Sequence, residues 1–193
     1  MNLANRLTML RIVLTFVFMM FLSWQGLFAK AMSLAIFAFA AISDYLDGWL
    51  AHKRNMVTDF GKLMDPIADK ILVLSAFLAF VQMGIIKDWM VTIIISREIL
   101  ITSLRLFALN KGKVLTASKA GKHKTVSQMV VIFFILGFIV FKQVMLDFFT
   151  WNPDWEILIF KQIIVVLMWV TVSLTVYSGF SYLWENRKVI ANI

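Results

Sequence analysis

Cysteine is absent from this sequence, which excludes disulfide bonds and thiol catalysis. The two histidines do not stand at a spacing that would build a zinc site. Charged residues are scarce as well: they make up 16% of the chain, whereas soluble domains carry about 25%. We find no internal repeat and no low-complexity segment, and we expect no cleavable signal peptide. The length of 193 residues predicts a single domain over residues 1–193.

Apolar residues dominate the composition. They make up 61% of the chain, and the mean hydropathy is +0.85. This composition predicts an all-α integral membrane protein with six transmembrane helices, each close to the ~20 residues that cross a bilayer. A short amphipathic helix over Met1–Leu10 is expected to lie at the membrane interface before them. The six predicted spans are Ile12–Leu27, Ala31–Ala51, Asp65–Ile86, Trp89–Asn110, Thr125–Phe141 and Gln162–Trp184.

The net charge of +8 indicates that the protein binds negatively charged partners. Nucleic acid is not expected, because the basic residues lie between apolar spans rather than in a basic domain. Anionic lipids and phosphates are the expected partners, in a lipid bilayer. Most lysines and arginines stand in the N-terminal segment, the 52–62 and 111–124 loops and the C-terminal tail. The positive-inside rule therefore predicts a multi-pass protein of the cell (cytoplasmic) membrane, with both termini on the cytoplasmic side.

One polar stretch, residues 44–69, interrupts the apolar pattern and holds five of the eleven acidic residues. Asp44 and Asp47 are three residues apart, and Asp65 and Asp69 are four apart. Each pair therefore shares one face if its segment is helical. The intervening residues 54–61 have the composition of a turn. An antiparallel helix pair would then direct four carboxylates into one space near the cytoplasmic surface.

Four carboxylates in one space repel one another strongly, and this cost is large near a membrane. Hard divalent cations such as Mg²⁺, Mn²⁺ or Ca²⁺ remove it, because they prefer carboxylate oxygens and water as ligands. Two ions suit four carboxylates better than one ion does. A two-metal site is typical of phosphoryl chemistry, in which the ions stabilise both the entering and the leaving oxygen.

The same stretch resembles the signature of the CDP-alcohol phosphatidyltransferases, D-x2-D-G-x2-A-R followed by x8-G-x3-D-x3-D. Seven of the eight fixed positions of this signature carry the same residue here, at the same spacing. The exception is His52, where the signature has arginine. The resemblance implies two divalent cations, Mg²⁺ or Mn²⁺, at Asp44, Asp47, Asp65 and Asp69, with Asp69 also the catalytic base. It implies that CDP-diacylglycerol binds at the following residues: Asp44, Asp47, Gly48, Ala51, His52, Arg54 and Gly61.

Two further groups of polar residues lie downstream. Arg97, Glu98 and Arg105 stand inside a predicted span, where ionisable residues usually face the bundle interior. The run Gly121–Thr125 is similar to the Gly-Lys-x-Lys-Thr run of phosphatidylglycerophosphate synthases, a branch of the family. That resemblance implies sn-glycerol 3-phosphate as the acceptor. Its phosphate would bind Arg97, Arg105, Lys122 and Lys124. The structural alternatives are a Glu98–arginine pair that joins helices and a plain positive-inside cluster.

Other readings remain open at this stage. Another family member, using inositol phosphate or acting as a cardiolipin synthase, would carry the same acidic signature. A divalent-cation transporter could use the same acids, although no predicted span is broken by glycine or proline at mid-membrane. Oligomeric state is open too, with a homodimer as one hypothesis. Transfer could be direct or pass through a covalent enzyme intermediate.

Overall fold

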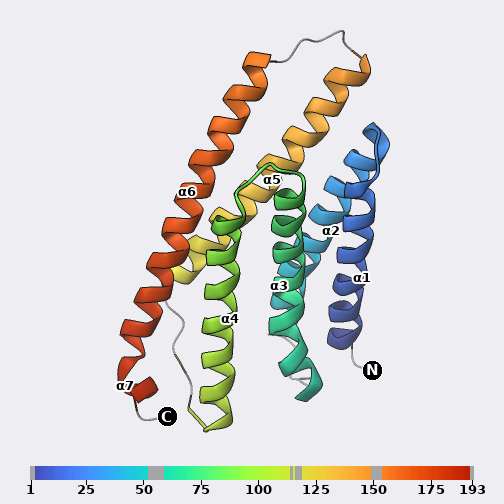
Figure 1. Cartoon of the computed structure of the whole chain (residues 1–193). Helices are drawn as coiled ribbons and strands as arrows, with labels where there is room; N and C mark the ends of the chain where they lie inside the picture. The colour runs from blue at the N-terminus through green and yellow to red at the C-terminus, as the bar shows by residue number, and fades with distance from the viewer. Residues whose placement is uncertain (1–2, 52–58, 114, 116–118, 149–153, 192–193) are drawn as a thin grey trace. The chain divides into compact units, whose positions relative to one another are not determined.

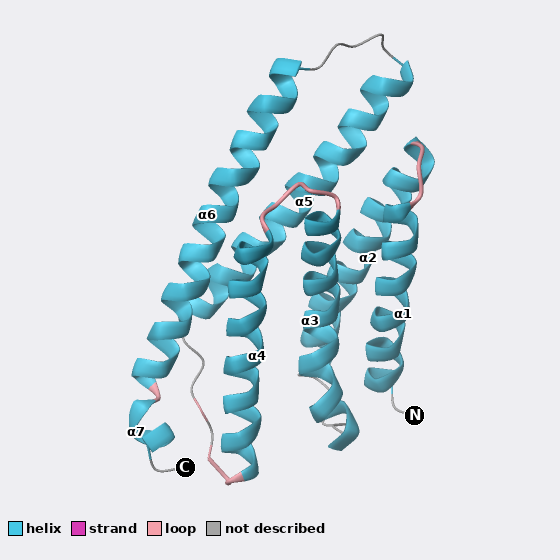
Figure 2. Ribbon diagram, in the orientation of Figure 1, coloured by secondary structure: helices cyan, strands magenta, loops and turns pink. Residues whose placement is uncertain are grey.

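The computed structural model describes residues 3–51, 59–113, 115, 119–148 and 154–191. Within those ranges the chain forms seven helices and no strand (Figure 2), and the expectation of an all-α protein is confirmed. In chain order the helices are α1 (Leu3–Ser23), α2 (Leu27–Ala51), α3 (Asp59–Gln82), α4 (Asp88–Asn110), α5 (Lys119–Phe148), α6 (Asp154–Glu185) and α7 (Arg187–Ala191) (Figure 1).

The separate interfacial helix predicted over Met1–Leu10 is wrong. Helix α1 runs without interruption from Leu3 to Ser23 and joins that segment to the first predicted span. The reason lies in the sequence, because neither proline nor glycine occurs in this stretch and nothing ends the helix at Leu10. Helix α1 ends instead before Gly26, whose φ of +96° is favourable only for glycine.

The predicted start of the third helix at Asp65 is also wrong. Helix α3 begins six residues earlier, at Asp59, so that Gly61 belongs to the helix and not to a turn. A carboxylate at position 59 suits a helix N-terminus, where backbone N–H groups and the helix dipole attract negative charge. Pro66 then lies inside the helix, where its missing N–H leaves the carbonyl of Lys62 without its usual intrahelical donor.

In the part of the chain that the structure describes, two helical segments are long and apolar enough to cross a membrane: 121–148 and 158–185. Three shorter apolar segments, 9–23, 27–43 and 70–82, belong to α1, α2 and α3. Large apolar side chains also point outward; Phe16 and Phe180 are each 70% exposed. Such surfaces suit lipid rather than water. The structure therefore indicates a membrane protein, and the number of six spans stays a prediction.

The chain divides into two compact units. Unit 1 comprises residues 1–79 and 133–154, and unit 2 comprises residues 80–132 and 155–193. Helices α3 and α5 each contribute residues to both units. The single domain expected over residues 1–193 stays a prediction.

In unit 1, α1 and α2 form an antiparallel helical hairpin (Figure 1). Phe18 and Phe37 are fully buried between them, with ring centroids 5.4 Å apart. Phe37 also meets the ring edge of Phe133 from α5 at 5.3 Å. At the turn, the Lys30 ammonium donates to the Leu22 carbonyl at 2.6 Å and satisfies one of the free acceptors at the end of α1. This hairpin holds the α2 segment that carries the first acidic pair.

In unit 2, α4 and α6 pack together with the first part of α5. Trp89 and Trp169 make an edge contact at 5.3 Å between α4 and α6. Further along the same pair of helices, Tyr182 packs with Ile101 and Ala108 in a buried apolar cluster. The polar residues of unit 2 lie between these apolar contacts.

Candidate active site

The four aspartates of the acidic signature all lie on helices of unit 1. Asp44 and Asp47 stand near the C-terminal end of α2, and Asp65 and Asp69 stand in the N-terminal half of α3. Because both segments are helical, each pair shares one face of its helix, as the spacing predicts. The connection between the two helices comprises only residues 52–58. The helical backbone that the carboxylate pairs require is thus present.

Other parts of the predicted site lie outside the described residues. His52 and Arg54 belong to the 52–58 connection. For the four aspartates, Gly48, Ala51 and Gly61 the structure describes the helical backbone but not the surroundings of the residue. The convergence of the carboxylates therefore stays a prediction. Among the side chains that the structure does describe, no group of three histidines, aspartates or glutamates forms a metal site.

The donor set of the acidic signature fits hard divalent cations. It offers two carboxylate pairs, one from each of two helices joined by a short connection, and no sulfur or paired imidazole. Carboxylate oxygens are the preferred ligands of Mg²⁺ and Mn²⁺.

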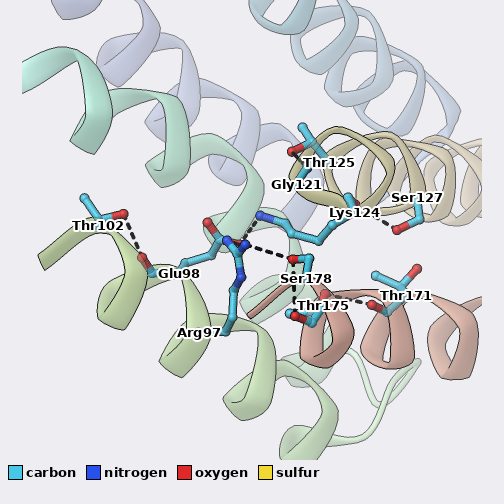
Figure 3. A network of polar contacts seen from close by, with 10 residues as sticks. All are labelled: Arg97, Glu98, Thr102, Gly121, Lys124, Thr125, Ser127, Thr171, Thr175 and Ser178. Atoms are coloured by element: carbon cyan, nitrogen blue, oxygen red, sulfur yellow. Dashed lines mark hydrogen bonds and ion pairs between the residues drawn. The ribbon is translucent and has the colours of Figure 1, made fainter. Parts of the chain in front are cut away.

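A buried ion cluster lies within unit 2 (Figure 3). Glu98 on α4 is 4% exposed, and Lys124 on α5 is 5% exposed. The Lys124 ammonium donates a hydrogen bond to Oε1 of Glu98. The Arg97 guanidinium reaches the same oxygen, with Nη1 at 3.4 Å. Two cations therefore share one carboxylate in the cluster of Arg97, Glu98 and Lys124.

Helix α6 holds the Arg97 side chain from the other side. Nη2 of Arg97 donates to Oγ of Ser178 at 2.8 Å. The next residue is Gly179, and a Cβ atom there would lie 3.3 Å from Cγ of Arg97. The small residues at 178 and 179 therefore let the arginine stem lie directly against α6. Arg97 still has hydrogen-bonding capacity, because its buried Nε–H has no partner among the described residues.

Hydroxyl groups line the same face of α6 at intervals of three and four residues. Thr171, Thr175 and Ser178 are fully buried. Thr175 donates to the Thr171 carbonyl at 2.7 Å, and Ser178 donates to the Thr175 carbonyl at 3.4 Å (Figure 3). These bonds satisfy the hydroxyls of Thr175 and Ser178 by using carbonyls of their own helix, whereas the Thr171 hydroxyl has no partner among the described residues. This face is therefore polar without carrying charge.

The structure separates the four predicted acceptor residues into two kinds. Arg97 and Lys124 meet at Glu98. Lys122 is exposed in the first turn of α5, and Arg105 is exposed on α4. The guanidinium carbon of Arg105 lies 5.8 Å from the ring centroid of Tyr182, in cation–π range. Eight residues along a helix correspond to a rotation of about 80°, and the two arginines approach α6 at different residues, Arg97 at Ser178 and Arg105 at Tyr182.

Sequence reasoning missed two contributors. Glu98 was paired only with an arginine, and the structure adds Lys124, which is 26 positions away in the sequence. The contacts of Ser178 and Gly179 with Arg97 were not predicted from the sequence. A serine next to a glycine in an otherwise apolar helix is a usable signal, since small residues mark close helix contacts in membranes.

The glycine contact leads to a prediction with an internal control. Gly137 lies in α5, and a Cβ atom there would meet nothing within 4 Å. Gly137→Ala is expected to stabilise the protein by about 0.5–1 kcal/mol, the usual gain from replacing a helical glycine. Gly179→Ala is expected to lose most of this gain, because the Arg97 side chain must move. Thermal unfolding of both variants in detergent measures the difference; equal stabilisation would contradict the contact.

The fold and the site together define a class of protein: an all-helical membrane protein with two acidic pairs on consecutive helices. The model of one family, CDP-alcohol phosphatidyltransferase, matches residues 1–177. The chain therefore belongs to the CDP-alcohol phosphatidyltransferase family. The expectation drawn from the acidic signature is confirmed.

Three relatives illustrate the likeness. A Bacillus subtilis (strain 168) protein named CDP-diacylglycerol–glycerol-3-phosphate 3-phosphatidyltransferase is 35% identical over 201 residues, covering 98% of this chain and 97% of its own. A protein of the same name from Rickettsia bellii (strain RML369-C) is 31% identical, covering 97% of this chain and 96% of its own. A Mycobacterium tuberculosis (strain CDC 1551 / Oshkosh) protein named probable phosphatidylglycerophosphate synthase is 43% identical, covering 68% of this chain and 64% of its own.

Proposed function

We propose that this protein transfers the phosphatidyl group of CDP-diacylglycerol to sn-glycerol 3-phosphate. The products are phosphatidylglycerophosphate and CMP. The observation that carries this proposal is the near full-length likeness to the Bacillus subtilis protein named for this reaction. Membership of a transferase family also speaks against the alternative of a divalent-cation transporter.

Two divalent cations, Mg²⁺ or Mn²⁺, would be held by Asp44, Asp47, Asp65 and Asp69. When bound, such ions neutralise the carboxylates and stabilise charge on phosphate oxygens during phosphoryl transfer. The helical pairing of these residues supports the proposal, because two faces of two helices can each present a pair of carboxylates.

The donor would bind over the end of α2 and the connection that follows it. Gly48 and Gly61 leave room for close approach of the nucleotide, and Ala51 is also small. His52 and Arg54 lie next in sequence and supply the polar contacts; Arg54 carries a permanent charge suited to the diphosphate.

Asp69 would act as the general base. Its carboxylate accepts the proton of the primary hydroxyl of glycerol 3-phosphate, and the hydroxyl oxygen forms a bond to the phosphorus attached to diacylglycerol. The bond from that phosphorus to the bridging oxygen breaks, and CMP leaves with the electron pair. In this direct form, no covalent bond to the enzyme is required.

The acceptor phosphate carries close to two negative charges and needs cations that the metal site does not use. Arg97, Arg105, Lys122 and Lys124 are the proposed ligands. The two cations gathered at Glu98 and the Arg97 Nε–H, which has no partner among the described residues, support this assignment. Charge-assisted hydrogen bonds from arginine and lysine are the usual means of holding phosphate.

An acceptor panel tests the proposed function. Purified protein in mixed micelles should release CMP from CDP-diacylglycerol only when a divalent cation and an acceptor are both present. Glycerol 3-phosphate should be the preferred acceptor over inositol phosphate and phosphatidylglycerol. Faster release with phosphatidylglycerol would identify a cardiolipin synthase instead, and release with inositol phosphate would identify the other branch of the family.

The proposed location is the cell (cytoplasmic) membrane, with six spans and with the termini and active site on the cytoplasmic side. The bias of lysine and arginine supports this orientation. A homodimer stays a prediction that cross-linking in the membrane can test.

Because the chain lacks cysteine, single-cysteine variants report topology without background. Cysteines at Arg54 and Lys188 are expected to react with a membrane-impermeant thiol reagent only after the cytoplasmic face is opened. A cysteine at Asp154 is expected to react in intact cells, or in spheroplasts if an outer membrane intervenes. The reverse labelling pattern would place the active site on the opposite face.

A further inference from the structure

Glu98 occupies a position that the proposed chemistry does not explain. It is a buried carboxylate inside a subsite that is expected to bind a phosphate, and like charges repel. It cannot contact the phosphate favourably itself. Any role in the reaction must therefore be exerted through the groups that it binds.

Two of those groups are Arg97 and Lys124, and both reach Oε1 of Glu98. The two cations come from different helices, α4 and α5, and without a shared anion they would repel each other in a nearly dry interior. Glu98 holds them close together. Ser178 holds the far side of Arg97, so the guanidinium is fixed from α4 and from α6 (Figure 3).

One buried donor of Arg97 is not used within this arrangement. Nη1 of Arg97 is directed at the carboxylate and Nη2 at Ser178, while the buried Nε–H has no partner among the described residues. A guanidinium carries five N–H groups, so one that is held at Nη1 and at Nη2 still has N–H groups to donate to an anion. Such fixed donors bind an anion with less loss of conformational entropy than mobile ones.

We propose that Glu98 is a positioning residue for the acceptor. It holds the side chains of Arg97 and Lys124 together as two preorganised cationic ligands of the acceptor phosphate, and it does not touch the substrate. This inference rests on the proposed function, because it names how the acceptor subsite of that reaction is preorganised. The expected consequence is selective: loss of Glu98 weakens use of the acceptor and leaves the donor almost untouched.

The test is steady-state kinetics of Glu98→Gln, with glycerol 3-phosphate and CDP-diacylglycerol varied separately. The amide keeps the size and one acceptor oxygen but removes the charge. The value of kcat/KM for glycerol 3-phosphate is expected to fall about 10–100-fold, the usual effect of a misplaced binding group. The KM for CDP-diacylglycerol is expected to stay within about twofold, since loss of acceptor positioning does not change ground-state binding of the donor.

Glu185→Gln is the matched control. Glu185 is an exposed carboxylate on α6 in the same unit, where its Oε1 accepts a hydrogen bond from Ser181. The substitution changes the net charge by the same amount away from the cluster, and wild-type kinetics are expected. Glu98→Asp keeps the charge but is one methylene shorter, so it should recover part of the loss. On a Lys124→Met background, Glu98→Gln should lower kcat/KM for glycerol 3-phosphate by a smaller factor than in the wild-type chain. One of the two cations that Glu98 positions is already absent there.

Three results would overturn the proposal. A lower acceptor KM in Glu98→Gln would mean that Glu98 only competes with phosphate for the cations. Equal changes for both substrates would indicate a purely structural role. If Glu98→Gln does not fold, wild-type acceptor kinetics in Glu98→Asp would contradict positioning. A wild-type protein that does not use glycerol 3-phosphate at all would defeat the proposed function instead, and the two failures are thereby distinguished.

Discussion

Replacing Asp69 by asparagine is expected to lower the turnover number by about 10²–10⁴-fold, the range that a general base contributes. The amide cannot accept the hydroxyl proton of glycerol 3-phosphate, but it is nearly identical in size. Asp69 stands well inside α3, so the helix should tolerate the exchange. CDP-diacylglycerol binding should largely persist, because the other three aspartates remain.

Turnover at saturating metal and both substrates measures this effect. Asp59→Asn is a matched control, since it makes the same exchange at the first residue of the same helix and outside the acidic signature. It is expected to keep wild-type turnover. Asp44→Asn and Asp65→Asn should behave differently from Asp69→Asn by raising the metal concentration needed for activity. Near wild-type turnover of Asp69→Asn would remove the role of general base from this residue.

The second large effect is expected at Lys124, with Lys122 as its comparison. Lys124→Met removes a cation from the buried cluster, while the ion pair between Glu98 and Arg97 remains. Loss of a charge-assisted contact costs about 1.5–3 kcal/mol, which is one to two decades in kcat/KM for glycerol 3-phosphate. Because the carboxylate is buried, the free energy of unfolding should also fall, by about 1–3 kcal/mol.

Lys122→Met separates binding from stability. Lys122 is exposed, so its replacement should lower kcat/KM for the acceptor while the unfolding temperature in detergent stays close to the wild-type value. Neither variant should greatly change the KM for CDP-diacylglycerol. Equal losses for both substrates, or none for either, would argue against a glycerol 3-phosphate pocket and favour the cardiolipin-synthase alternative.

The helices were largely predictable because long apolar stretches without proline or glycine have few other structures in a membrane. The predictions failed at helix ends. At Asp59 and Asp65 two acidic residues both suit a helix start, and the proline after Asp65 favoured the wrong one. At Leu10 the composition changes from polar to apolar, which favours a helix boundary. Nothing in the backbone chemistry ends the helix there, and α1 continues to Ser23.

The acidic site could be predicted because its information is local: spacings of three and four residues place carboxylates on one helical face wherever the segment is helical. The cluster around Glu98 could not, because Lys124 and Ser178 are 26 and 80 positions away and no periodicity within one helix connects them. Charge alone predicted an arginine as the partner of Glu98, in a pair that joins helices. The contact between α4, α5 and α6 is a property of tertiary packing and had to be observed.

The central claim is that glycerol 3-phosphate receives the phosphatidyl group, and the lipid product tests it most directly. Purified protein is incubated with CDP-diacylglycerol, glycerol 3-phosphate and Mg²⁺ or Mn²⁺, and the lipid extract is analysed by mass spectrometry. We expect one new lipid that combines the phosphatidyl group with glycerol 3-phosphate and carries a phosphomonoester, in equal amount to the CMP released. Phosphatidic acid in place of that lipid, or CMP release without it, would contradict the claim.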